Sequence, residues 1–335
     1  MMMRRAMFAV LSACLLTASP AWAGERAVTV AAAGNVRLSG TLLLPDGPAP
    51  AGGFPALLLV QGSGPTDRDG SQKGMQADLL KQVAAALAGK GIASLRLDKR
   101  GMHANAAQMP EDAAGLAAFY TWDAAIGDLA ASYAALGGEA GIDPARTGIL
   151  GHSEGALLLL AAADAGKVAP RAAVMLAGPG RPLGDLLAEQ LTRLLIRQGA
   201  PPAVQQQFLD ADRAIRQEIV ATGQVPVDKV PPGLQALYPA YLGNFLHGLL
   251  TFDPAAAAGR ARMPLLALFG SRDMQVSPEQ DAAALRRTLS GRTDGSAVIV
   301  LDGLSHNMKR GDPGFTGPAD PAALTAVTDW VAGHL

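Results

Sequence analysis

The five residues at 151–155, Gly-His-Ser-Glu-Gly, are the motif in this chain with the clearest capacity for chemistry. They follow a short apolar segment typical of a strand and precede one typical of a helix. A serine at such a strand-to-helix turn projects from the edge of the sheet, where its hydroxyl can act as a nucleophile. Gly151 and Gly155 permit the tight bend because they lack a Cβ atom. We predict that Ser153 is a nucleophile, the alternative being a serine that only caps the helix.

A serine hydroxyl needs a general base, and the chain has five histidines. His306 follows a predicted strand at 297–301, in a loop at the carboxyl edge of the sheet, where parallel sheets present functional groups. The other four occupy an early loop, the serine turn itself, a helical segment and the C-terminus: His103, His152, His247 and His334. His306 is therefore the predicted base, the alternative being a solvated loop histidine.

The base in turn needs a carboxylate that fixes its tautomer and stabilises the imidazolium ion. Asp273 directly follows a predicted strand at 265–269 and so reaches the same edge. Asp302 and Asp253 are weaker rivals, and Asp302 lies very close to the histidine in sequence. A salt bridge with Arg272 or a turn cap is the alternative role for Asp273. The predicted catalytic residues are thus Ser153, Asp273 and His306.

A sheet must bring these loops to one edge, and the pattern of apolar residues predicts such a sheet. The pattern predicts strands at 28–30, 36–44, 56–60, 92–97, 147–150, 172–176, 265–269 and 297–301. It predicts helices at 75–87, 121–136, 156–163 and 322–332. Alternating strands and helices favour the α/β class, with a mostly parallel central sheet and helices on both faces.

This alternation stops after residue 180. Residues 181–256 show only helical periodicity with proline-rich joints, which predicts an inserted all-helical cap. The predicted organisation is a signal peptide at 1–23, a first core part at 24–180, the cap at 181–256 and a second core part at 257–335.

Three segments, together with the order serine, aspartate, histidine, carry a family resemblance. They read Gln-Gly-Ser-Gly-Pro-Thr-Asp-Arg-Asp-Gly at 61–70, Arg-Leu-Asp-Lys-Arg-Gly at 96–101 and Gly-His-Ser-Glu-Gly-Ala at 151–156. The chain resembles the α/β-hydrolase superfamily and, more narrowly, a bacterial group of capped esterases and serine-aminopeptidase-like hydrolases. The resemblance implies the α/β-hydrolase fold and a lid at 181–256, which could also be a packed subdomain that touches no substrate. Members of the group usually have histidine where this chain has Gln61.

The resemblance and the predicted topology both imply an oxyanion hole. The loop after the strand at 56–60, which contains Gly62, would offer the backbone N–H of Ser63, and the serine turn would offer that of Glu154. The loop could also be a plain surface loop, and no Gly-Lys-Ser/Thr follows it to suggest a phosphate cradle. The segment 98–101, Asp-Lys-Arg-Gly, is interpreted as a structural salt-bridged turn, the alternative being a catalytic motif.

Charge and composition restrict the partners. The chain has 28 basic and 29 acidic residues and is only 4% aromatic, so it lacks the positive excess and the stacking platforms typical of nucleic-acid binding. After the first 23 residues, no stretch reaches 18 uninterrupted apolar residues, and no integral membrane span is expected. We expect a small-molecule ester substrate and neither a metal nor an organic cofactor.

The first 23 residues have the pattern of a signal peptide. Arg4 and Arg5 precede an apolar run at 6–18, and Ala-Trp-Ala at 21–23 supplies the small residues of a cleavage site. The pattern predicts a periplasmic or secreted protein. The alternative is a lipoprotein, because Leu-Ser-Ala-Cys at 11–14 resembles a lipobox that would acylate Cys14.

The expected function is hydrolysis of a carboxylic ester through an acyl-enzyme. A peptidase of the aminopeptidase type remains an alternative and would need an acidic cap residue to hold a substrate amine. Candidates for that residue are Glu189, Asp210, Asp212 and Glu218. A transacylase would use the same residues with an alcohol acceptor, and a noncatalytic binding module is the alternative from another class.

Overall fold

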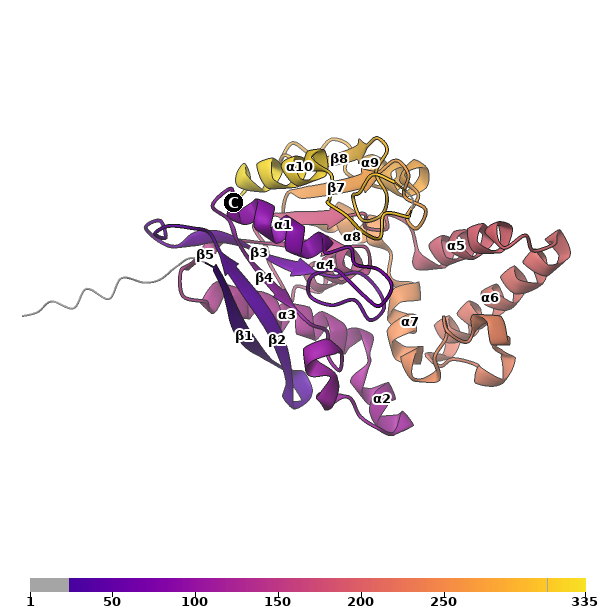
Figure 1. The fold of residues 1–335 in the computed structure, drawn as a ribbon. Coiled ribbons are helices and arrows are strands. Elements are labelled where there is room, and N and C mark those ends of the chain that lie inside the picture. Colours follow the sequence, from indigo (N-terminus) through magenta and orange to yellow (C-terminus); the bar gives the residue numbers. More distant parts are fainter. Residues whose placement is uncertain (1–23, 312) are drawn as a thin grey trace, which may run out of the picture.

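The structure is a computed structural model that describes residues 24–311 and 313–335. Within these ranges eight strands form one sheet in the order β1-β2-β4-β3-β5-β6-β7-β8 (Figure 1). The strands are β1 (Gly24–Ala32), β2 (Val36–Leu44), β3 (Phe54–Val60), β4 (Ala93–Leu97), β5 (Ile142–His152), β6 (Ala173–Leu176), β7 (Leu265–Gly270) and β8 (Ala297–Leu301). β1 pairs with β2, and β2 with β4, in antiparallel fashion, whereas all later neighbours are parallel. The predicted mostly parallel sheet is confirmed.

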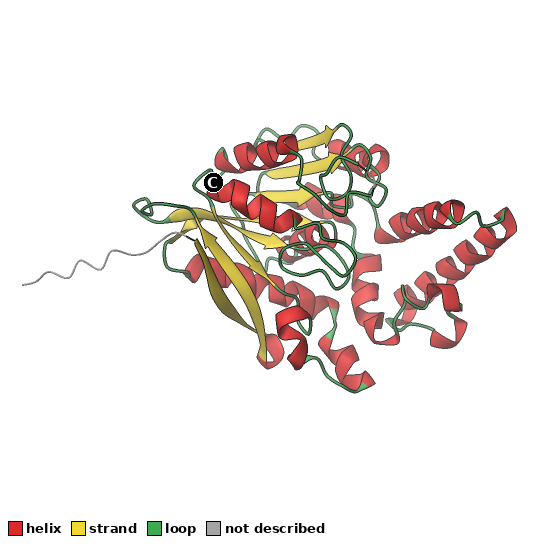
Figure 2. Ribbon diagram, viewed as in Figure 1, coloured by secondary structure: helices red, strands yellow, loops and turns green. Residues whose placement is uncertain are grey.

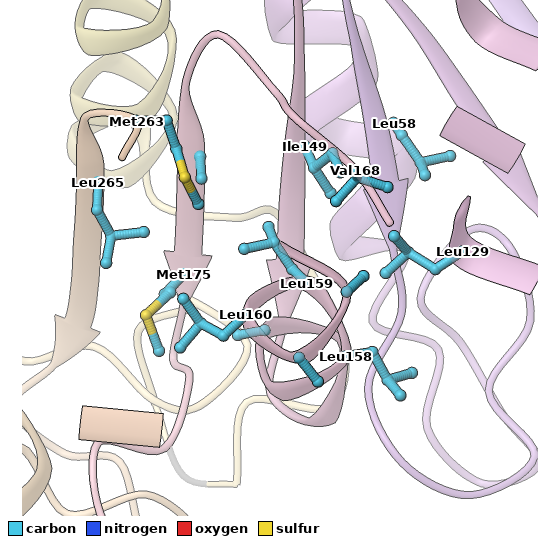
Figure 3. Close-up of a cluster of buried hydrophobic side chains, with 14 of the residues drawn as sticks. Leu58, Leu129, Ile149, Leu158, Leu159, Leu160, Val168, Met175, Met263 and Leu265 are labelled. Carbon is cyan, nitrogen blue, oxygen red and sulfur yellow. The ribbon is translucent and has the colours of Figure 1, made fainter. Parts of the chain in front are cut away.

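Helices cover both faces of this sheet (Figure 2). They are α1 (Leu79–Ala88), α2 (Ala113–Phe119), α3 (Trp122–Gly138), α4 (Glu154–Asp164), α8 (Pro254–Arg260), α9 (Ala283–Thr288) and α10 (Pro321–Ala332). Because successive strand side chains point to opposite faces, Leu57 and Leu59 pack towards α1 and α10, while Leu58 packs towards α3 and α4. Figure 3 shows the core on the face of the sheet that α3 and α4 cover, in which Leu129 and Leu159 lie against the sheet. Burial on both faces explains the continuous apolar sequence of the central strands.

A group of helices follows β6 and extends away from the sheet (Figure 1). It consists of α5 (Leu183–Arg197), α6 (Pro202–Thr222) and α7 (Gly243–Thr251), with short 3₁₀ turns between α6 and α7. We call these helices and their connections the cap. The cap has its own small apolar cluster: Leu191, Leu195, Ile215, Ile219, Val225, Val230, Leu234, Tyr238 and Leu246. The segment 181–256 therefore contains the cap and the first residues of α8, whose Ala257 and Ala258 pack with the main core.

The start of α1 differs from the sequence prediction. The helix expected from residue 75 begins at Leu79, because Asp78 has a left-handed backbone with φ 48°. The Ser71 hydroxyl donates to the Asp78 carboxylate at 2.7 Å and accepts from the Asp78 N–H at 2.9 Å. Side-chain bonds of this kind compete with helical hydrogen bonding and delay the helix start. The short helix α2 was also not expected from the pattern.

Two sequence predictions concern residues outside the described ranges. The signal peptide at 1–23 and the acylation alternative at Cys14 both lie there. Among the residues that the structure describes, no helix combines the length and apolar character needed to cross a membrane.

Candidate active site

Ser153 occupies the turn between β5 and α4 in a strained backbone conformation, with φ 53° and ψ −120°. Residues other than glycine rarely adopt a positive φ, so the surrounding packing must hold the Ser153 backbone in this conformation. A Cβ atom at Gly151 would collide with the Gly155 carbonyl, and one at Gly155 would lie 2.5 Å from the carbonyl oxygen of Val60. Both glycines are therefore required by the close approach of α4 to the strands. The geometry is that of a nucleophile elbow.

His306 and Asp273 form a buried pair at the ends of the two neighbouring strands β8 and β7. His306 Nδ1 lies 2.8 Å from Asp273 Oδ2. The other carboxylate oxygen, Oδ1, accepts the N–H groups of Gln275 at 2.8 Å and Val276 at 2.9 Å, which fixes its orientation. Because a carboxylate only accepts hydrogen bonds, Nδ1 carries the proton in the neutral ring. Nε2 is then left as a basic nitrogen.

His152 connects the serine turn to the histidine loop. Its Nε2 lies 3.1 Å from the carbonyl oxygen of His306, and the centroids of the two rings are 4.8 Å apart. Burial, helped by the neighbouring His306, lowers the pKa of His152 to about 3, so its ring is neutral and donates to this carbonyl. The Ser153 and His306 side chains make no direct hydrogen bond here. Catalytic hydrogen bonds are often loose before substrate binds, so this spacing is compatible with a catalytic pair.

The rival carboxylates have other partners. Asp302 accepts the hydroxyl of Ser271 at 2.9 Å, and Asp253 caps α8 by accepting the N–H of Ala256 at 3.0 Å. Neither contacts His306 in the described structure. Geometry therefore favours Asp273 over both as the partner of the histidine.

The loop after β3 lies directly against the serine turn. A Cβ atom at Gly62 would lie 3.2 Å from both Ser153 Cβ and His152 Nδ1. Within the described residues, the Ser63 N–H donates to no protein acceptor. Glu154 is the first residue of α4, where N–H groups have no intrahelical acceptor and carry the positive end of the helix dipole. The two predicted oxyanion donors thus flank the nucleophile as unpaired N–H groups.

Gln61 ties this loop to the sheet. Its side chain is buried, and its amide nitrogen donates to the carbonyl oxygen of Leu97 at 2.9 Å. This bond joins the end of β3 to the end of β4. The Gln61 amide therefore anchors the start of this loop to the neighbouring strand.

The segment 98–101 makes the salt bridges expected from its sequence. Asp98 pairs with Arg68 at 2.5 Å, and Arg100 pairs with Asp128 at 2.6 Å. Lys99 makes contacts that the sequence interpretation missed, because its Nζ donates to the carbonyl oxygens of Gly62 and Gly64. β4 is the parallel neighbour of β3, so residues just after β4 lie at the same edge as that loop. This topological relation is the signal that could have identified Lys99.

A cavity of about 470 Å³ opens beside Ser153, between the core and the cap. Its volume lies within the range of small-molecule sites. The core side includes Ser63, Ser153 and Glu154, and the cap side includes Leu187, Leu237 and Phe245 among other apolar residues. An apolar cavity with a serine hydroxyl in its wall suits a substrate that has an apolar portion and one polarised carbonyl group.

Every carboxylate in the lining of this cavity is paired with a cation. The pairs are Asp98 with Arg68, Asp128 with Arg100, and Glu154 with Lys99. Within the described residues, the cavity therefore presents no unpaired negative charge to a ligand.

Comparisons with known proteins agree with this architecture. No family model matches the chain. Over 304 aligned residues the chain is 30% identical to Esterase EstD of Thermotoga maritima, and the match covers 88% of this chain. The chain spans 65% of the length of that relative.

Solved structures show the same fold at low sequence identity. A puromycin-hydrolyzing peptidase of Mycobacterium tuberculosis matches with a TM-score of 0.57 and 19% identity, over 93% of this chain and 40% of that one. The esterase domain of a Rhodothermus marinus protein matches with a TM-score of 0.53 and 17% identity, over 92% of this chain and 98% of that one. A Pyrococcus furiosus esterase matches with a TM-score of 0.53 and 16% identity, over 92% and 91%. With its strained serine turn and its sheet order, this chain has the α/β-hydrolase fold.

Proposed function

We propose that the protein is a serine hydrolase that cleaves small carboxylic esters through an acyl-enzyme intermediate. The observation that carries the proposal is the buried His306–Asp273 pair beside a strained Ser153 at the wall of an apolar cavity. The similarity to Esterase EstD supports ester hydrolysis as the reaction class.

In the proposed mechanism, Ser153 Oγ attacks the ester carbonyl carbon while His306 Nε2 accepts the hydroxyl proton. Asp273 stabilises the resulting imidazolium ion through Nδ1. The carbonyl oxygen becomes an oxyanion that accepts the N–H groups of Ser63 and Glu154, each worth about 2.7 to 4 kcal/mol in the transition state. His306 then donates its proton to the departing alkoxide. Water, deprotonated by His306, then attacks the acyl carbon, the bond to Ser153 Oγ breaks, and His306 returns the proton to Oγ as the acid leaves.

The paired carboxylates of the cavity favour simple acyl esters over aminoacyl substrates. A substrate ammonium group needs an available negative charge, and the three cavity carboxylates are already paired with Lys or Arg. The four acidic cap residues considered from the sequence, Glu189, Asp210, Asp212 and Glu218, do not line the cavity. Glu189 is paired with Arg181 and Arg193, and Asp212 with Arg216. These contacts support ester hydrolysis over an aminopeptidase activity.

The test compares p-nitrophenyl esters with aminoacyl p-nitroanilides on purified protein. We expect turnover of the esters, little turnover of the anilides, and loss of ester turnover in Ser153→Ala. Faster turnover of the anilides would favour the peptidase, and ester products formed with added alcohols would favour a transacylase. Unchanged ester hydrolysis in Ser153→Ala would contradict the proposal.

We also propose export to the periplasm or the medium, on the basis of the leader-like residues 1–23. Intact mass of the exported protein is expected to place its N-terminus at Gly24. A lipid-modified N-terminus at Cys14 would contradict free export.

A further inference from the structure

We propose that Lys99 is a positioning residue that fixes the oxyanion hole by holding the loop at 62–64 against the serine turn. The inference rests on the proposed function. Lys99 Nζ lies 2.6 Å from the carbonyl oxygen of Gly62, 3.1 Å from that of Gly64 and 3.3 Å from Glu154 Oε1. An ammonium group has three donors, and these contacts account for all three.

The contact with Gly62 sets the direction of the Ser63 N–H. The Gly62 carbonyl and the Ser63 N–H belong to the same peptide unit, which is planar and trans, so they point in opposite directions. Holding the carbonyl towards Lys99 therefore holds the N–H towards the opposite side. Hydrogen bonding of a cation to the carbonyl also polarises the peptide and strengthens its N–H as a donor.

The loop needs such an anchor because its own sequence restrains it weakly. Gly62 and Gly64 flank Ser63, and Gly64 has a φ of 72°. Glycine has access to more backbone conformations than any other residue, so the peptide between them would otherwise rotate more freely. Two carbonyl contacts from one ammonium remove that freedom.

The third contact extends the restraint to the second donor. Glu154 supplies the other oxyanion N–H, and its carboxylate pairs with Lys99. One ammonium thus binds the residues that carry both donors. The adjacent charges, Asp98 and Arg100, have separate partners in Arg68 and Asp128, so this role belongs to Lys99 alone within the segment.

The primary test is Lys99→Met, measured with p-nitrophenyl acetate. Misplacement of one donor is expected to lower kcat by about 10- to 100-fold, with KM changed by less than about threefold. The matched control is Lys90→Met, which removes a surface lysine paired with Asp329 at 2.8 Å and is expected to keep full activity.

Chemical rescue separates positioning from a general loss of structure. The only cysteine in the chain is Cys14. A Cys14→Ser chain carrying Lys99→Cys therefore has one thiol, and alkylation with 2-bromoethylamine restores an ammonium at nearly the original length. We expect kcat to recover at least tenfold after this treatment and to stay low after iodoacetamide.

Three results would overturn the inference. The first is unchanged kcat in Lys99→Met, with normal ester hydrolysis by the unsubstituted protein, which would leave the proposed function intact. The second is a rise in KM alone, which would make Lys99 a substrate contact. The third is absence of Ser153-dependent hydrolysis in the unsubstituted protein, which would remove the proposed function and the inference together.

Discussion

The carboxyl edge of the sheet and the cap are held in place by different kinds of contact. At the sheet edge, Asp273 accepts an N–H group of its own loop and contacts His306 from the neighbouring strand end, and the carbonyl of Gly62 accepts from Lys99. The interior of the cap is instead a small apolar cluster, and α5 joins the cap to the loop after β7 because Gln190 and Arg193 donate to the carbonyl oxygens of Gln275 and Met274. We infer that the core sets the orientation of the reacting groups, while the cap supplies much of the apolar wall of the cavity. We expect substitutions at the edge to change rates and substitutions in the cap to change substrate preference.

Asp273→Asn tests the edge with the largest expected effect. The amide removes the negative charge that stabilises the imidazolium ion and can hold His306 in the wrong tautomer, so we expect kcat to fall by about 10⁴-fold. Steady-state kinetics on p-nitrophenyl acetate measures this. Asp302→Asn is the matched control, because Asp302 accepts the Ser271 hydroxyl and, within the described residues, makes no hydrogen bond to His306, and its kcat is expected to stay within about twofold. Equal losses in both variants would contradict the assignment.

His152→Asn tests the buried link between the serine turn and the histidine loop. The pKa of His152 is about 3 in the folded protein, below its ordinary value of 6.5, so the unfolded chain binds a proton that the folded protein excludes between these values. Stability is then fully present above pH 6.5 and decreases as the pH falls towards 3. The expected loss from this residue between pH 7 and pH 4.5 is about 2.5 kcal/mol.

Urea unfolding at the two pH values measures this dependence. The unsubstituted protein is expected to lose more stability than His152→Asn by that amount. The same pH dependence in both proteins would mean that His152 is not buried in its neutral form.

Leu237→Ala tests the cap with the smallest expected effect. Leu237 lines the cavity but is 45% exposed, so truncation is expected to cost little stability. We expect the rate on acetate to stay within about twofold, while the ratio of octanoate to acetate turnover changes by about two- to tenfold. A large loss on acetate would mean that the cap takes part in positioning the reacting groups.

The contrast between the sheet edge and the cap also explains which features could be predicted from the sequence. Ser153, Asp273 and His306 each follow a short apolar strand, and parallel strands deliver such residues to one edge whatever the details of packing. The orientation of their side chains and the contact of Asp273 with two backbone N–H groups needed the structure. Each of these depends on loop backbone geometry that no periodicity encodes.

Other features depended on contacts between distant segments. Lys99 contacts backbone carbonyls about 35 positions away in the chain. Every residue has a backbone carbonyl, so no residue type in the sequence marks the partner of Lys99. The late start of α1 depended on the Ser71–Asp78 bonds. In the cap, helical periodicity identified the helices, but the choice of cavity-lining residues, such as Leu237 and Phe245, depends on how those helices pack together.

The most direct test of the central claim is reaction of the purified, folded protein with a fluorophosphonate probe, followed by mass mapping of the modified peptide. An activated serine displaces fluoride and retains the phosphonyl group, so the account predicts one label per chain at Ser153. The account also predicts no label in Ser153→Ala and strongly reduced labelling in Asp273→Asn. A folded protein that takes up no label, or takes it up at another residue, would contradict the assignment of Ser153 as the nucleophile.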